Sequence, residues 1–525
     1  VHEKDGDGKN FLAGVMTNGY NKDITANLTI NSKGSISINA KSENDSSVLG
    51  VWAKSDDKIT IKNNNGDITI DVIKESGINK SYIANPSEEE KTLHAVYGLN
   101  ASKYPNDKTV DKGSSINITA DEGSITVTAK SNSTDLKDSY VYAAANDNGN
   151  IILKAADNIS LESYANNNNN AYGLDTWAGK ENSLEADKIN VYAKTEGGDA
   201  YAINVDNGSI ENRLKAEESN VIKAESENGN AYAVSVKKGS TVNIASDKNN
   251  YISAYVNNSD KESVAIKADG VNSIVLVAGK ENYINSSEDS YYAGSINGLA
   301  ISAENSAYVD IKSEVDGITK IGGAVYAKDS NTIVSIVGKN NNVKNNIYSA
   351  AVIENAGDLQ NSNDEDMRKL NVVSALYAED GATINLSGIN NIQTYYKNPS
   401  DDTTSERVVW AYDKANINID GYTYISTYDY ENSPNSMDIA IAAGTATNLN
   451  APVKDRATVT LTYDNFKTND GKEVMSNITG DILSAYAGQV DITAAENSEA
   501  GINITGNLLA GNNGILSVDL GKGGV

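Results

Sequence analysis

Hydrophobic and polar residues alternate over short stretches throughout this chain. In the segment NAYAVSVKKGSTVNIASDKNN, alternate positions hold Tyr232, Val234 and Val236. After the turn residues KKGS, the alternation resumes with Val242 and Ile244. A period of two residues is typical of a β-strand with one buried face, and Gly-containing polar pairs mark tight turns. The pattern therefore predicts short β-strands joined by tight turns.

The same short phrase recurs along the chain. A small or aliphatic residue, an aromatic residue and then Ala or Gly are spaced by about 30 residues in many copies, and such a period indicates a solenoid or repeat array. The copies are Val51-Trp52-Ala53, Val96-Tyr97-Gly98, Val141-Tyr142-Ala143, Ala171-Tyr172-Gly173, Ala200-Tyr201-Ala202, Ala231-Tyr232-Ala233, Tyr291-Tyr292-Ala293, Val325-Tyr326-Ala327, Leu376-Tyr377-Ala378, Val409-Trp410-Ala411 and Ala485-Tyr486-Ala487. With Asn- and Gly-rich corners between strands, the repeat predicts an all-β fold, a right-handed parallel β-helix with about 30 residues per coil.

Proline positions agree with this prediction. A proline cannot donate a hydrogen bond within a central strand, and all five prolines lie in polar segments between the periodic ones. We expect residues 1–23 to form an amino-terminal cap or disordered leader and residues 24–525 to form one β-helix. Loop insertions are expected near residues 80–94, 355–369, 398–407, 430–437 and 449–456.

Charge and composition narrow the possible partners. The chain has 44 basic and 71 acidic residues, so its net charge of −27 repels nucleic acids and anionic membranes. It contains no cysteine, which excludes disulfides and thiolate metal sites. No apolar run approaches the ~20 residues that a membrane-spanning helix needs. We therefore expect no nucleic-acid partner and no insertion of this chain into a membrane.

These features resemble the passenger domain of a bacterial type V, monomeric autotransporter adhesin. The resemblance rests on acidic, cysteine-free repeats rich in Asn, Ser, Thr and Gly, and on the segment ITGNLLAGNNGILSVDLGKGG at residues 504–524. It implies a secreted protein displayed on the bacterial cell surface after removal of a signal sequence. It also implies anchoring to the outer membrane through a translocator barrel missing from this sequence, and roles in cell adhesion, autoaggregation and biofilm formation.

Histidine and arginine are scarce, whereas carboxylates are too numerous to indicate a catalytic site. A Ser-His-Asp triad would have to use His94, and no serine has a G-D-S-G or G-x-S-x-G context. We therefore expect no enzyme activity, no catalytic residue, no metal site and no cofactor. The histidines and arginines of the chain are His2, His94, Arg213, Arg368, Arg407 and Arg456.

Among the 29 tyrosines, two sets differ in the predicted direction of their side chains. By strand parity, Tyr201 shares a face with Ile203 and Val205, which predicts that the repeat aromatics stack inside or at the edge of the coil. A second set is expected to point outward. Each of these tyrosines is the fourth residue of a stretch whose first and third residues fit the core, so the tyrosine falls on the opposite face. Its members are Tyr192, Tyr255, Tyr395 and Tyr428.

The segment GYTYISTYDYENS contains the predicted ligand-binding residues. Tyr422, Tyr424, Tyr428 and Tyr430 share strand parity opposite a buried isoleucine, and Tyr395 is expected one coil below. The predicted loops at 355–369, 398–407 and 430–437 follow at nearly coil spacing and should project on the same side. Rigid aromatic rings flanked by polar loops are suited to binding.

Three functions are compatible with this pattern. The first is an elongated adhesin that attaches to other cells, to host or bacterial surface glycans or proteins, or to its own copies. The second is a polysaccharide-degrading enzyme on the same fold, which would need paired carboxylates and an arginine within hydrogen-bond reach. The third is a structural stalk for a binding domain outside this sequence.

Overall fold

The computed structural model describes most of the 525-residue chain. Residues 2–4, 10–11, 348–352, 395–397 and 428 are described by their backbone only. The residues outside the description are 1, 5–9, 18–24, 43–46, 55, 76–94, 103–112, 133–139, 168, 210, 258–260, 287–297, 339–342, 353–373, 398–406, 429–438, 445–455, 469–470, 497 and 523. The described residues form β-strands and contain no helix, which confirms the all-β prediction.

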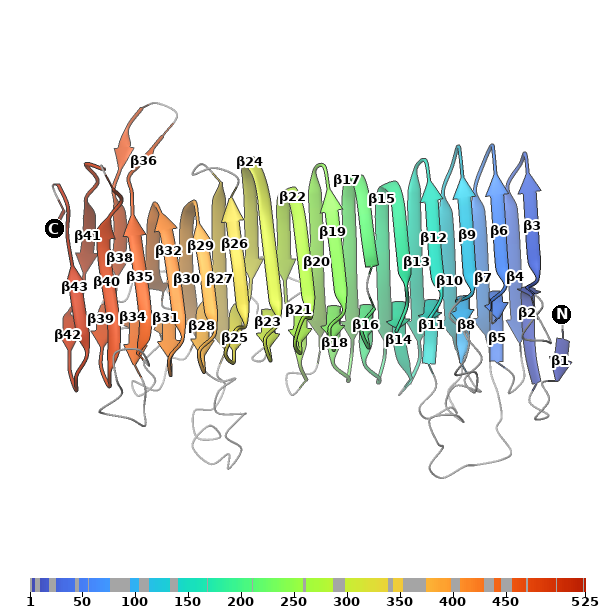
Figure 1. Cartoon of the computed structure of the whole chain (residues 1–525), viewed down its shortest axis with the longest axis horizontal. Helices are drawn as coiled ribbons and strands as arrows, with labels where there is room; N and C mark the ends of the chain where they lie inside the picture. Colours follow the sequence, from blue (N-terminus) through green and yellow to red (C-terminus); the bar gives the residue numbers. More distant parts are fainter. Residues whose placement is uncertain are drawn as a thin grey trace, which may run out of the picture. The chain divides into compact units, whose positions relative to one another are not determined.

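The chain divides into two compact units. Unit 1 comprises Val1–Ala265 and Asn272–Leu276, and unit 2 comprises Ile266–Val271 and Val277–Val525. Strands β21 (Ser263–Asp269) and β22 (Ile274–Asn285) contribute residues to each. Within each unit, parallel strands follow one another in sequence order, as expected for a parallel β-helix (Figure 1).

Each coil of unit 1 contributes to three rows of strands, and β15 and β17 run through both the second and the third row. The first row contains β1 (His2–Lys4), β2 (Asn10–Thr17), β5 (Ser47–Lys54), β8 (Val96–Ser102), β11 (Tyr140–Asp147), β14 (Asn170–Trp177), β16 (Ala200–Asp206) and β18 (Ala231–Lys237). The second contains β3 (Asn27–Ser32), β6 (Lys58–Asn63), β9 (Ser115–Ala120), β12 (Asn150–Ala155), β15 (Glu181–Thr195), β17 (Glu211–Ser226) and β19 (Thr241–Ser246). The third adds β4 (Ile36–Ser42), β7 (Ile68–Lys74), β10 (Ile125–Ser131), β13 (Asn158–Ala165) and β20 (Asn249–Val256).

Unit 2 has the same three-row organisation, with β24 running through the second and third rows. Its first row contains β23 (Gly298–Glu304), β25 (Ala324–Lys328), β28 (Leu376–Glu379), β31 (Arg407–Tyr412), β34 (Ile439–Gly444), β39 (Asp481–Ser484) and β42 (Leu508–Ala510). The second contains β24 (Tyr308–Gly322), β26 (Ile333–Gly338), β29 (Thr383–Ser387), β32 (Asn416–Gly421), β35 (Ala457–Tyr463), β40 (Gly488–Ala494) and β43 (Ile515–Val518). The third adds β27 (Lys344–Val352), β30 (Ile389–Lys397), β33 (Thr423–Tyr428), β38 (Ser476–Thr479) and β41 (Ile502–Thr505). A short antiparallel hairpin joins β36 (Phe466–Lys467) and β37 (Glu473–Val474).

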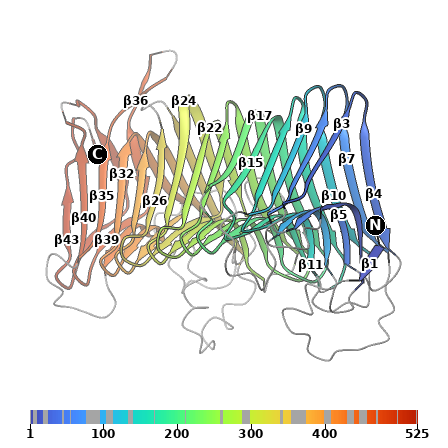
Figure 2. The same ribbon diagram turned by 45° about the vertical axis from the view of Figure 1, so that its right-hand side comes forward.

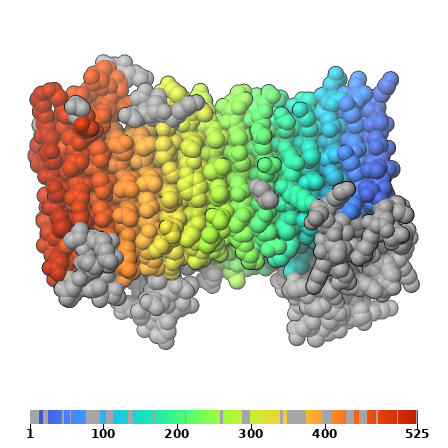
Figure 3. Space-filling model, in the orientation of Figure 1, coloured from blue at the N-terminus to red at the C-terminus, as the bar shows by residue number. Residues whose placement is uncertain are grey.

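The core of each coil consists of aliphatic residues that align from one coil to the next. In unit 1, Ile116 is paired in register with Ile59 and with Ile151, and all three are fully buried. Burial of each such side chain contributes about 1.5–3 kcal/mol relative to exposure. Within each unit, Figures 2 and 3 show the strands and the surface that they form following one another in the order of the sequence colours. The apolar positions of the two-residue alternation in the sequence are therefore the buried positions of the strands.

Buried asparagines join neighbouring coils at the corners. Asn182 Nδ2 donates to Asn212 Oδ1 at 2.6 Å and to Thr176 Oγ1 at 2.8 Å, and Asn146 Nδ2 donates to Asn182 Oδ1 at 2.7 Å. Asn207 turns a corner with a φ of 60°, a left-handed conformation that asparagine tolerates. The Asn-rich corners predicted from sequence thus have a structural role.

The predicted boundaries are described only in part. Within residues 1–23, Asn10–Thr17 forms β2, which pairs in parallel with β5. The predicted insertions at 80–94, 355–369 and 430–437 lie outside the described residues, as do 398–406 and most of 449–456. The division into a cap or leader and one β-helix stays a prediction. No helix capable of crossing a membrane occurs among the residues that the structure describes.

Candidate ligand-binding surfaces

The predicted tyrosine site in unit 2 lies on β30 and β33. These strands pair in parallel, with Tyr395 directly opposite Tyr428, so their predicted one-coil separation is confirmed. The side chains of these two tyrosines and all of Tyr430 lie outside the description. The gathering of the tyrosine rings therefore stays a prediction.

Tyr422 and Tyr424 have different surroundings. Tyr424 is partly exposed and precedes the fully buried Ile425, so its predicted outward direction is confirmed. The Tyr422 ring contacts Phe466 with centroids 5.9 Å apart, and burial raises the pKa of its hydroxyl. Tyr422 therefore packs against the β36–β37 hairpin, whereas Tyr424 presents part of its side chain to solvent.

A second aromatic surface, which we call the tyrosine ladder, lies on the first row of unit 1. Its rings stack in parallel, with neighbouring centroids 4.9–5.0 Å apart and interplanar angles of 4–19°. This spacing is close to the separation of adjacent strands, so the coil repeat sets the ring separation. The members are Tyr97, Tyr142, Tyr172, Tyr201 and Tyr232.

The ladder lies on the outer face of the coil. The prediction that Tyr201 shares a face with Ile203 is therefore wrong. Ala202 and Ile203 are both fully buried, whereas Tyr201 stays partly exposed. The glycine equivalent to Ala202 in the preceding coil is Gly173, and a β-carbon there would lie 2.7 Å from Cγ1 of the core residue Val191. Two consecutive residues therefore face inward, which reverses the alternation. The predicted stacking of the aromatics is confirmed.

A polar row runs beside the ladder on the same outer face. Asn204 Nδ2 donates to Asp175 Oδ1 at 2.8 Å. Burial raises the pKa of Asp175 to about 6, the hydrogen bond from Asn204 opposes this shift, and the nearby Asp206 and Asp147 add to it. Burial, and then the charge of Asp175, raise the pKa of Tyr172 well above its ordinary value. The ladder hydroxyls therefore remain protonated near neutral pH.

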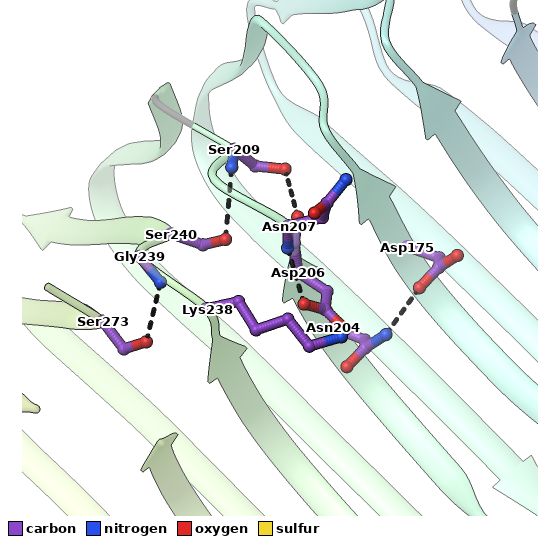
Figure 4. A network of polar contacts seen from close by, with 9 residues as sticks. All are labelled: Asp175, Asn204, Asp206, Asn207, Ser209, Lys238, Gly239, Ser240 and Ser273. Atoms are coloured by element: carbon purple, nitrogen blue, oxygen red, sulfur yellow. Dashed lines mark hydrogen bonds and ion pairs between the residues drawn. The ribbon is translucent and has the colours of Figure 1, made fainter. Parts of the chain in front are cut away.

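The polar row continues into the corner that follows β16, which Figure 4 shows from close by. Lys238 Nζ lies 3.3 Å from Asp206 Oδ2 and 5.2 Å from the centroid of Trp177. Ser209 N donates to Ser240 Oγ at 3.2 Å, which links the equivalent corners of two coils. Trp177 retains 49% exposure, so a large part of its side chain is accessible to solvent.

Stacking limits what the tyrosine ladder can bind. Both faces of Tyr142 are covered by its neighbours, and the same holds for Tyr172 and Tyr201. A sugar ring needs an open aromatic face, so the partly exposed Tyr172 and Tyr201 can offer only edges and hydroxyl groups to a ligand, and Tyr142 is buried. Sequence reasoning missed this outward orientation, because Tyr201, Ile203 and Val205 fit regular alternation on one face equally well.

Unit 2 carries a separate aromatic stack on its first row. Tyr377 lies between Tyr326 and Trp410, with centroid separations of 5.5 and 4.7 Å. Tyr326 and Tyr377 each donate a hydrogen bond to the buried Glu379, at 2.6 and 2.7 Å. Lys328 Nζ lies 3.6 Å from the same carboxylate. Glu379 is therefore a paired structural carboxylate that fixes two of the three rings.

The arginines that the structure describes have no carboxylate partner. Arg213 is exposed on β17. Arg456 Nη1 donates to the backbone carbonyl of Asn513 at 3.0 Å, and Arg407 stacks on Trp410. No group of three metal-ligating side chains occurs within the described part of the chain. Arg368 and His94 lie outside the described residues, and only the backbone of His2 is described.

Comparisons with family models, curated proteins and solved structures found no match to this chain.

Proposed function

We propose that this chain is a non-catalytic adhesin that attaches to surface glycans or proteins of other cells, or to its own copies. The observation that carries this proposal is that accessible aromatic side chains occur on the outer faces of first-row strands, among them the partly exposed Tyr201 and Trp410 and the exposed Trp177. Tyrosine and tryptophan combine apolar area with a polar tip and lose little conformational entropy on binding. Display on a bacterial surface and anchoring to an outer membrane are part of the same proposal.

Repetition supports attachment in a further way. Because each coil places its outer side chains about 4.8 Å from those of the next, one weak contact can recur along a unit. Several weak contacts to one polymer or cell act together and increase avidity without any single tight site. Such a surface fits adhesion better than chemistry at one point.

The proposal is tested by coating beads with the full chain and measuring their attachment to epithelial cells, to bacterial cells and to beads bearing the same chain. We expect attachment to at least one of them. Replacing Tyr395, Tyr424 and Tyr428 with serine should reduce that attachment if the predicted site in unit 2 is used.

A matched control replaces Tyr192 and Tyr255 with serine. Both are partly exposed tyrosines of unit 1, on β15 and β20. Equal melting temperatures must show that all variants fold. Undiminished attachment of the folded triple variant would move the site elsewhere, and a lack of attachment to every surface would refute the adhesin proposal. Release of products from pectins or glycosaminoglycans would favour the enzyme alternative instead.

A further inference from the structure

The outer face of β31 carries an arginine at the end of the unit 2 aromatic stack. Val409 and Ala411 are fully buried, so Trp410 between them points outward, where its ring stacks on Tyr377. The Arg407 Cζ atom lies 4.0 Å from the Trp410 ring centroid. The residue opposite Trp410 on the next coil is Ala442, whose small side chain leaves room for the guanidinium group.

This guanidinium group has no anionic partner among the described residues. Its Nε atom is buried and makes no hydrogen bond. Burial lowers the pKa of Arg407, which means that its charge is desolvated, and the neighbouring Tyr377 and Tyr412 oppose this shift. Lys328 in the same unit, by contrast, is paired with Glu379. A desolvated cation without a counter-charge is costly, and an anionic ligand would offset that cost.

We propose that Arg407, held against Trp410, anchors a subsite for an acidic sugar whose carboxylate accepts hydrogen bonds from the guanidinium group. This inference rests on the proposed adhesin function and specifies its ligand class. A planar carboxylate matches the fork of guanidinium donors, and stacking on Trp410 orients that fork in advance.

Tyr412 favours a sugar over a simple anion. Its ring is inclined by 66° to that of Trp410, with the centroids 5.5 Å apart. The two rings therefore do not stack face to face, and Tyr412 stays partly exposed, so part of its ring can contact the C–H groups of a pyranose ring. Arg407 and Tyr412 lie on the same strand and together provide a charged and an apolar contact.

The charge of the whole chain selects among acidic glycans. A net charge of −27 repels a densely charged polyanion at long range. One guanidinium group can neutralise one carboxylate. The subsite therefore fits an isolated acidic sugar in an otherwise neutral glycan rather than a highly sulfated polymer.

The experiment compares methyl β-D-glucuronide with methyl β-D-glucoside, which differ in the carboxylate, by NMR titration of the full chain at millimolar sugar concentrations. We expect the glucuronide to bind at least tenfold more tightly. Arg407→Gln should abolish this preference, and Arg407→Lys should retain only part of it because lysine keeps the charge but lacks the planar fork. Arg213→Gln, which removes an exposed arginine from unit 1, should leave the preference unchanged.

Several results would overturn the inference. These are equal affinity for the two sugars, binding of neither, or an Arg407→Gln chain that folds and keeps the preference. If Arg407→Gln does not fold, the Arg407→Lys chain decides the question, and an undiminished preference in that folded chain would overturn the inference. Tighter Arg407-dependent binding of a short glutamate-containing peptide would replace the sugar by an acidic peptide. Bead attachment that persists in a folded Arg407→Gln chain would refute this subsite alone, whereas a lack of attachment by the unaltered chain refutes the adhesin proposal.

Discussion

Asp175 provides the sharpest test of the electrostatics of the tyrosine ladder. Its carboxylate lies on the outer face of β14 and accepts a hydrogen bond from Asn204 at 2.8 Å. Burial raises its pKa from 3.8 to about 6, with Asp206 and Asp147 adding to the effect. Replacement by asparagine keeps the shape and the acceptor oxygen but removes the charge. Asp175→Asn should therefore stabilise unit 1 near neutral pH.

The magnitude follows from the size of the pKa change. A rise from 3.8 to about 6 is roughly 2 pKa units, each equivalent to about 1.4 kcal/mol. Because Asp175 retains partial exposure, we expect about 1–3 kcal/mol. Below pH 3.8 the carboxyl group is protonated in both the folded and the unfolded chain, so its burial carries no cost of burying a charge. As the pH rises towards 6, the unfolded chain releases the proton first, so the unaltered protein loses stability.

The assay is urea denaturation followed by circular dichroism at a series of pH values from about 3.5 to 8. The stability difference between Asp175→Asn and the unaltered chain should grow between pH 4 and 6 and then stay constant. Asp157→Asn removes an exposed carboxylate at a corner of the same unit and serves as the control. A difference that does not change with pH, or a variant less stable at pH 7, would refute the reasoning.

Two further substitutions test the packing of unit 1. Asn182→Ala should lower the free energy of unfolding by about 2–4 kcal/mol, because Asn146 and Asn212 lose their hydrogen-bond partner in a buried corner. Thermal unfolding measures this change, and an unchanged melting temperature would contradict the prediction. Gly173→Ala should lower the free energy of unfolding by about 1–3 kcal/mol, because the added β-carbon would lie 2.6 Å from the Ala202 carbonyl oxygen. Urea denaturation measures this change, and an unchanged free energy of unfolding would mean that neighbouring coils move apart easily.

Much of the fold could be predicted from local sequence alone. Alternation such as that of Ile116 and Ile118 identifies strands with one buried face, and the recurring phrase identifies coils of similar length. In a parallel β-helix each strand pairs with its equivalent in the next coil, so the order of repeats along the chain is also the order of strands in the sheet. The backbone pairing of Tyr395 with Tyr428 was predictable for this reason.

The direction of particular side chains depended on the tertiary structure. The consecutive inward positions of Ala202 and Ile203 place the Tyr201 ring on the outer face, and the sequence phrase alone did not distinguish that arrangement from regular alternation. The stacking of Arg407 on Trp410 likewise depends on the small Ala442 opposite the ring. Strand periodicity is a local property of the chain, whereas the space available to a side chain is set by residues one coil away, and that space decided which groups reach the surface.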